Sequence, residues 1–323
     1  MAFLTPELDT PAKGSLTRAP QVHSVDPQRG PSRSRMRRND RRARSGVGGY
    51  LKSSGLAYTA LIVLGLIVMG SLFAPLISPY ERDAIDLSSQ YLAPSLEHPF
   101  GTDDLGRDIF VRVMYGGRVS LAVGFAAMLV ALLLGVVAGG IAGYYGGFVD
   151  SLIMRFVDLM LAVPVFFIIL FLSGVVASGI GIPLLCLMIG MTQWMEVARL
   201  VRAVVLSTRE FEFVDAARVL GLSDGRIIVR HLLPHAVSPV MVAITLGLAQ
   251  AIIIESALSF LGFGLHPPTP SWGAMLQNAQ GYLSTCPWIA IFPGLMIFLT
   301  VICCNVLADF LGEAFSPNSG PRI

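Results

Sequence analysis

Long apolar stretches without a single charge alternate with polar segments along the chain. Residues 57–77 and 121–144 each have the length of one membrane-crossing helix, because a bilayer core of about 30 Å needs roughly 20 helical residues. Residues 159–195 also lack charge but number 37, and one helix of that length would extend about 55 Å. We therefore expect this stretch to fold back at residues 178–183, which are rich in glycine and end in proline.

Six membrane-spanning helices follow from this pattern, and an even number places both ends of the chain on the same side. The expected fold class is an all-α integral membrane protein, a bundle of six transmembrane helices. Oppositely charged residues at helical spacing, Arg155 with Asp158 and Glu196 with Arg199, are interpreted as ion pairs within single helices. The expected spans are residues 57–77, 121–144, 153–177, 184–204, 238–260 and 288–307.

The composition supports a membrane protein. Hydrophobic residues make up 54% of the chain, charged residues 14%, and the mean hydropathy is +0.69. A typical soluble domain has about 25% charged residues, so too few charges remain to cover a globule of this size. The composition therefore excludes a secreted disulfide scaffold, a disordered chain and a typical soluble enzyme, and it predicts a surface that faces membrane lipid.

Charge is distributed unevenly, and it divides the chain into regions. Residues 1–56 carry a net charge of +7, directly before the first apolar span. Such a tail could bind nucleic acid, but its position favours a disordered cytoplasmic tail near anionic lipid, with both termini inside the cell. We expect a tail at 1–50, a membrane domain at 51–317 with a cytoplasmic loop at 205–237, and a short cytoplasmic tail at 318–323.

The loop between the fourth and fifth spans has the most informative sequence. Residues 211–240 read FEFVDAARVLGLSDGRIIVRHLLPHAVSPV, which predicts a short helix over residues 214–220 with Asp215 near its start. Ala216 and Ala217 are small enough for a partner surface to approach closely. Gly221 is placed to end the helix in a left-handed conformation.

The second half of this loop predicts another short helix. Ser223 or Asp224 can cap its start, and Arg226 and Arg230 lie four apart on one face. Pro234 should stop or kink the chain before the next span. We expect a helix–turn–helix that projects into the cytoplasm; the alternative is a solvated loop whose charges only set the orientation in the membrane.

This loop resembles that of the membrane permeases of ABC importers. Their pattern is Glu-Ala-Ala, three residues, Gly, nine residues, then Ile-x-Leu-Pro. The chain has Asp215 in place of Glu and His231 in place of Ile. It matches the pattern at Ala216, Ala217, Gly221, Leu233 and Pro234. In that family the loop is a coupling helix that docks in a groove of the ATPase subunit, so the resemblance implies this role for Asp215 through Pro234.

Three further segments, residues 98–124, 249–276 and 287–317, are similar to the peptide/nickel branch, the dipeptide permease C type. The resemblance covers residues 50–317 and implies the type I ABC importer permease fold in a prokaryotic plasma membrane. It implies a homologous second permease, two ATP-binding ATPase subunits, an extracytoplasmic binding protein, and a peptide, nickel, haem or another small solute as substrate. ATP and Mg would bind to the partners, since this chain has no Gly-Lys dipeptide and hence no P-loop.

Few other residues suggest chemistry. Glu255, with Ser259 one turn later, either lines the pathway near an outer gate or makes a structural hydrogen bond. The spacing of a calcium loop is absent from the acidic group Asp103, Asp104 and Asp108. We interpret the four cysteines as small buried apolar residues. We therefore expect neither a catalytic nor a metal site. An ion-coupled carrier would need more buried carboxylates or histidines. Close helix packing, in the bundle or between subunits, is expected at Gly135, Gly139 and Gly143.

Overall fold

Helices make up most of the described chain. The computed structural model describes residues 55–77, 80–175, 181–265 and 268–315, all within one compact unit, Val47–Ile323. The predicted tails at 1–50 and 318–323 and the first half of the predicted turn, residues 178–180, lie outside the described residues. Among the described residues there is no β-strand, only an isolated bridge between Thr102 and Asp108, so the all-α prediction is confirmed.

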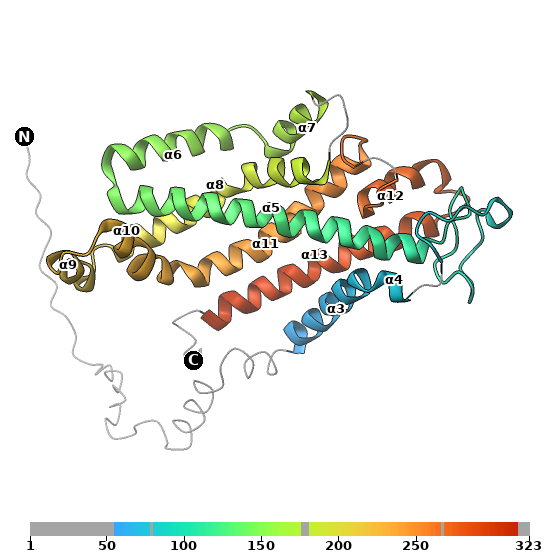
Figure 1. Ribbon diagram of the computed structural model, residues 1–323, viewed down its shortest axis with the longest axis horizontal. Helices are drawn as coiled ribbons and strands as arrows, with labels where there is room; N and C mark the ends of the chain where they lie inside the picture. Colours follow the sequence, from blue (N-terminus) through green and yellow to red (C-terminus); the bar gives the residue numbers. More distant parts are fainter. Residues whose placement is uncertain (1–54, 78–79, 176–180, 266–267, 316–323) are drawn as a thin grey trace, which may run out of the picture. The chain divides into compact units, whose positions relative to one another are not determined.

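Five described helices are long and apolar enough to cross a membrane, and a bent pair makes up to six. Figure 1 shows the long helices α5, α8, α11 and α13 lying side by side, with α9 and α10 at one end and α12 at the other. We call these the loop end and the α12 end. The main helices are α3 (Gly55–Leu72), α4 (Ala74–Ile77), α5 (Ile109–Tyr145), α6 (Gly147–Leu161), α7 (Val165–Val175), α8 (Ile182–Thr208), α9 (Glu212–Val219), α10 (Asp224–Ile227), the π-helical turn η2 (Ile228–Leu232), α11 (Leu233–Phe260), α12 (Trp272–Ala279) and α13 (Trp288–Phe315). Two short 3₁₀ turns, η1 (Leu87–Ser89) and η3 (Gln280–Tyr282), complete the described elements.

The third predicted span is not one straight helix. The expectation of a continuous helix over 153–177 is wrong, because α6 and α7 are separated at residues 162–164 and meet at 77°. Pro164 explains the break, since its ring lacks an N–H and disfavours helical geometry at the residue before it. The apolar pattern continues through Pro164 and therefore gave no sign of the bend.

The second span is longer than predicted and begins at Ile109. Asp108 fixes this start, because its carboxylate accepts a hydrogen bond from the N–H of Val111 at 2.9 Å. Arg112 and Arg118 lie inside the added turns, which is why a search for charge-free stretches missed them. Arg118 donates to the carbonyls of Ser71 and Leu72 at the end of α3, so its charge stabilises helix packing.

The stripe of small residues on α5 packs against α8 of the same chain. A Cβ atom at Gly139 would lie 2.4 Å from the carbonyl oxygen of Ala198, and one at Gly135 or Gly143 would lie within 2.8 Å of a valine side chain of α8. The two helices therefore approach to a distance that only glycine allows. This close contact holds α5 against the helix that leads directly into the 205–237 loop.

Candidate docking loop between α8 and α11

The loop predicted at 205–237 contains a short helix, α9, that starts directly after α8. α9 covers Glu212–Val219, close to the predicted 214–220. Glu212 and Asp215 lie in its first turn and Arg218 in its last, which complements the helix dipole. Asp215 and Arg218 form an exposed ion pair at 2.9 Å. An exposed pair of this kind contributes little stability, so the helix depends on its ends and on its packing.

Gly221 ends α9 in the left-handed conformation, with φ of +76°. The N–H of Gly221 donates to the carbonyl of Arg218 at 2.9 Å, and the N–H of Leu222 donates to that of Ala217 at 3.2 Å. This pair of bonds is the Schellman motif, which satisfies the last carbonyls of a helix. No heavy atom lies within 4 Å of a Cβ placed on Gly221, so the backbone angle, and not a lack of space, favours glycine here.

The helix that begins at α10 continues into the next membrane span without a break. Of the stop or kink predicted at Pro234, the stop is wrong, because α10, η2 and α11 together form an uninterrupted helical run over Asp224–Phe260. Pro234 follows the π-helical turn, which changes the backbone hydrogen-bonding pattern at the point where the proline has no N–H to donate. Ser223 precedes α10 but makes no side-chain cap bond.

Residues 221–225 read Gly-Leu-Ser-Asp-Gly, which has the G-x-S-x-G spacing of a serine-hydrolase nucleophile elbow. That motif requires a sharp turn from a strand into a helix. Here helices α9 and α10 flank the segment, so the spacing has no catalytic context in the described structure.

One face of the loop is anchored in the bundle. Val214 and Ala217 of α9 are buried, as are Ile227 of α10 and Leu232 at the end of η2. They join a cluster with residues of α5, α8 and α11: Tyr144, Val197, Val201, Val205, Ala236 and Val240. Burial of these side chains attaches α9 firmly to the long helices, so a force on α9 would reach them.

The opposite face of the loop exposes large apolar side chains. Val219 is 88% exposed and Leu220 is 78% exposed, next to the small, exposed Ala216. Phe211 and Val229 are exposed by more than half. Apolar side chains gathered on a projecting loop indicate an interaction surface. We call Ala216, Val219 and Leu220 the α9 tip.

Polar contacts tie the loop to α5 at the same end. The hydroxyl of Tyr144 donates to Asp224 at 2.6 Å, and Nη1 of Arg209 donates to the carbonyls of Gly143 and Tyr144 at 3.1 and 3.3 Å. The guanidinium of Arg218 lies 5.6 Å from the centre of the Tyr144 ring. A hydrogen bond with Tyr144 is the largest of the contributions that raise the pKa of Arg218 above its ordinary value.

Salt bridges also connect α6 with α8, in a pattern that differs from the prediction. Arg199 pairs with Asp158 at 2.5 Å, and Arg202 pairs with Asp150. Asp158 and Arg199 were expected to pair within their own helices. The structure joins them across helices because α6 and α8 lie next to each other, which spacing along a single helix cannot reveal.

Glu255 lies toward the α12 end, and its side chain has no exposed surface. Its carboxylate accepts hydrogen bonds from Ser120 of α5 at 2.9 Å and from Ser259 at 2.8 Å. The N–H of Trp272, at the start of α12, donates to the hydroxyl of Ser120 at 3.3 Å. Glu255 therefore belongs to a polar cluster that connects α5, α11 and α12.

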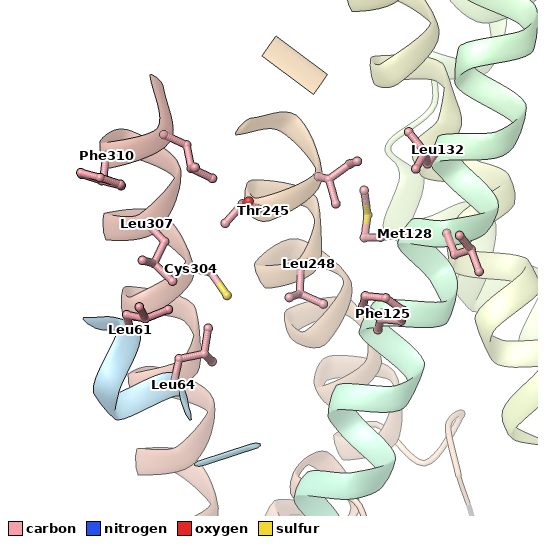
Figure 2. A pocket seen from close by; sticks show the side chains of 13 residues that line it. Leu61, Leu64, Phe125, Met128, Leu132, Thr245, Leu248, Cys304, Leu307 and Phe310 are labelled. Atoms are coloured by element: carbon pink, nitrogen blue, oxygen red, sulfur yellow. The ribbon is translucent and has the colours of Figure 1, made fainter. Parts of the chain in front are cut away.

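A cavity of about 470 Å³ lies between α3, α5, α11 and α13 (Figure 2). Its lining is almost entirely aliphatic and aromatic, with Cys304 and Thr245 as the exceptions. The Thr245 hydroxyl already donates to the carbonyl of Met241 at 2.8 Å. The cavity offers no free polar group among its lining residues and is therefore unsuited to a peptide or an ion.

Known proteins resemble this chain over most of its length. A family model described as binding-protein-dependent transport system inner membrane component matches residues 131–319. A second, described as the N-terminal TM domain of oligopeptide transport permease C, matches residues 49–94.

Curated relatives cover a similar extent. The dipeptide transport system permease protein DppC of Alkalihalophilus pseudofirmus is 42% identical over 267 residues, which are 83% of this chain and 87% of that protein. The oligopeptide transport system permease protein OppC of Escherichia coli K12 is 43% identical over 81% of this chain and 86% of its own length. The glutathione transport system permease protein GsiD of Shigella flexneri is 43% identical over the same shares.

Proposed function

Because the chain belongs to the family of binding-protein-dependent transport system inner membrane components, we propose that it is a permease subunit of an ATP-driven importer of peptides. The family match and the relatives, named as dipeptide, oligopeptide and glutathione permeases, support this function. The relatives are transport permeases and not enzymes. We assign ATP and Mg²⁺ binding to separate ATPase subunits.

The complete importer in this proposal contains four kinds of protein. This chain and a homologous permease enclose the pathway in the membrane lipid, two ATPase subunits bind at the loop end, and an extracytoplasmic binding protein delivers the peptide at the α12 end. The basic N-terminal region, with its net charge of +7 over residues 1–56, supports an orientation with both termini in the cytoplasm.

The exposed α9 tip is the observation that supports the proposal most directly. Val219 and Leu220 expose apolar surface in a short helix whose other face is anchored in the bundle. An isolated membrane protein gains nothing from such surface in water, whereas a groove on an ATPase subunit would bury it. When ATP binding draws the two ATPase subunits together, the α9 tip would move with them, and α8 and α11 would tilt because both continue directly into the loop.

We propose that Asp215, Ala216, Ala217, Gly221, Leu233 and Pro234 act together in this coupling, with distinct tasks. Ala216 faces outward and leaves room for the partner, while Ala217 faces the bundle. Gly221 fixes the end of α9, and Leu233 with Pro234 starts the helix that receives the movement.

We further propose that Glu255 and Ser259 contribute to the outer gate by holding its helices together. The hydrogen bonds from Ser120 and Ser259 to a fully buried carboxylate support this role over direct contact with the peptide in this conformation. The cluster would close the α12 end while the loop end is open, and the gate would open when α11 tilts.

Purification of the tagged chain from its native membrane tests the proposed function. We expect a second permease and two copies of an ATPase subunit to co-purify in detergent, and we expect the complex in vesicles to take up a labelled tripeptide only with ATP and binding protein present. A chain that purifies alone and takes up the tripeptide along an ion gradient would instead be a secondary carrier, and the proposal would be wrong.

A further inference from the structure

The end of α5 forms an unusual set of contacts with the loop, although α5 is not connected to it in sequence. Tyr144 and Asp224 are 80 residues apart, yet the tyrosine hydroxyl donates to the carboxylate at 2.6 Å. Arg209, which follows α8, donates to the last carbonyls of α5. The loop thus contacts α5 both before α9 and after it. We call Tyr144, Arg209 and Asp224 the α5 latch.

Burial and charge make the α5 latch a specific connection. Tyr144 is only 9% exposed, and its ring packs edge-to-face on Tyr145 with the Arg218 guanidinium on another side. The carbonyls that Arg209 binds are the ones that a helix end leaves without partners, and a cation is favoured there by the helix dipole. A phenol donating to a carboxylate is a charge-assisted hydrogen bond, which is stronger than a neutral one.

α5 reaches from this latch to the α12 end in one piece. It has 37 residues, about 55 Å at helical rise. Near its start, Ser120 contacts both Glu255 and the N–H of Trp272, and the carbonyl of Val113 accepts from the indole of Trp272 at 2.9 Å. A displacement of the loop end of α5 would therefore act directly on α12 and on the polar cluster around Glu255.

We propose that the α5 latch makes α5 move together with the loop, so that the coupling movement reaches the α12 end through α5 as well as through α8 and α11. This inference rests on the proposed function, because it needs a partner that moves the loop. Tyr144 and Asp224 act as positioning residues: they contact neither peptide nor nucleotide but fix α5 to the moving segment. Packing on α8 attaches α5 to the segment before α9, whereas the bond from Tyr144 to Asp224, together with the packing of Tyr144 near Ile227 and Leu232, attaches it to the segment after α9.

Paired spin labels test whether α5 and the loop move as one body. We would place labels at Glu212→Cys, an exposed residue of α9 outside the α9 tip, and at Leu133→Cys on the exposed face of α5. The four native cysteines are buried and should not react. The distance is measured by pulsed electron paramagnetic resonance in the assembled transporter in nanodiscs, without nucleotide and after trapping with ATP, Mg²⁺ and vanadate.

With Tyr144 present, we expect one narrow distance peak that is the same in both states. Tyr144→Phe keeps the buried ring and removes only the hydroxyl that binds Asp224. The distance peak should then shift or split on trapping, and the share of molecules at the parent distance should fall about fivefold. Tyr145→Phe is the matched control, because its hydroxyl lies 3.4 Å from Asp224 and its side chain is more than half exposed; it should behave like the parent. Asp224→Ala, an exposed change that leaves the core intact, should reproduce the Tyr144→Phe result.

The results separate this inference from the proposed function. A peak that moves on trapping in the parent protein, or that stays fixed in both Tyr144→Phe and Asp224→Ala, would overturn the α5 latch while an ATPase still bound the loop. Assembly of the chain without any ATPase subunit would overturn the proposed function and, with it, the source of the movement. A fixed peak that only the two latch variants release would support the inference.

Discussion

Gly221 offers the sharpest test of how α9 is held in shape. Its φ of +76° lies in the region that L-residues avoid, and no atom lies within 4 Å of the position where a Cβ would be. Gly221→Val therefore introduces backbone strain and no steric clash with the rest of the chain. The strain for an ordinary residue is roughly 1–2 kcal/mol, and valine, which is branched at Cβ, belongs at or above the upper limit.

A cost of about 2 kcal/mol lowers the ratio of capped to uncapped α9 by about 30-fold. α9 has eight residues, and helices of this length are marginal without their ends and tertiary contacts. Since the affected residues lie outside the spans, the protein should still reach the membrane in normal amount. Uptake of a labelled tripeptide should fall by up to about 30-fold, and ATP hydrolysis by the complex should no longer depend on the binding protein.

Gly221→Asn is the matched control, because asparagine accepts the left-handed region far better than valine. Uptake and hydrolysis by this variant should stay close to those of the parent. The reasoning would be refuted if Gly221→Val transported normally. Equal loss in the valine and asparagine variants would also refute it, since the size of any side chain, and not the backbone angle, would then decide the outcome.

Three further substitutions test the packing, the start of α5 and the polar cluster. Gly139→Ala places a Cβ 2.4 Å from a carbonyl of α8 and should lower the free energy of unfolding by about 1–3 kcal/mol, measured as Tm in detergent, whereas Gly65→Ala in open space should not. Asp108→Ala removes both the N-cap of α5 and the contact of Asp108 with His98. The loss of the cap alone should cost about 1 kcal/mol, and Asp108→Asn, which can still cap the helix, should restore that part. Glu255→Leu leaves the buried hydroxyls of two serines without an acceptor and should cost about 1–3 kcal/mol, while Glu255→Gln should be milder.

Each of these predictions has a result that would count against it. Equal Tm for Gly139→Ala and Gly65→Ala would mean that α5 and α8 can separate freely. An Asp108→Asn variant as unstable as Asp108→Ala would assign the effect to the lost charge and not to the cap. Normal stability but abolished uptake in Glu255→Gln would favour direct contact between Glu255 and the transported peptide.

Much of the fold could be predicted from apolar stretches alone, because a lipid environment requires long helices with satisfied backbone groups. Apolar stretches did not predict the helix bounds around Arg112, Arg118 and Pro164. Arg112 and Arg118 hid the first turns of α5. Their charges are satisfied by Asp103 and Asp83 in the preceding segment and by carbonyls of α3, which the apolar pattern does not reveal. Pro164 bends the third span inside an apolar stretch that looks uniform.

The candidate site shows the same limits. Local backbone features could be predicted. The residues before Gly221 predicted a short helix and Gly221 predicted its left-handed end, and the structure has the helix α9 with that end. The partners of charged residues could not be predicted from the sequence, since Asp158 pairs with Arg199 of another helix and Asp224 accepts a hydrogen bond from Tyr144 of α5. Which face of α9 is exposed also depends on tertiary packing, because Ala217 turned inward while its neighbour Ala216 faces outward.

The most direct test of the account is a cross-link from the α9 tip to the ATPase subunit. Leu220→Cys, labelled with a short photoreactive reagent in the assembled complex, should cross-link to the ATPase in high yield. The control is Leu96→Cys, a fully exposed leucine between α4 and α5, which should give no ATPase product. Equal labelling of the ATPase from both positions, or none from Leu220→Cys in a complex that contains the ATPase, would contradict the claim that the α9 tip is the docking surface.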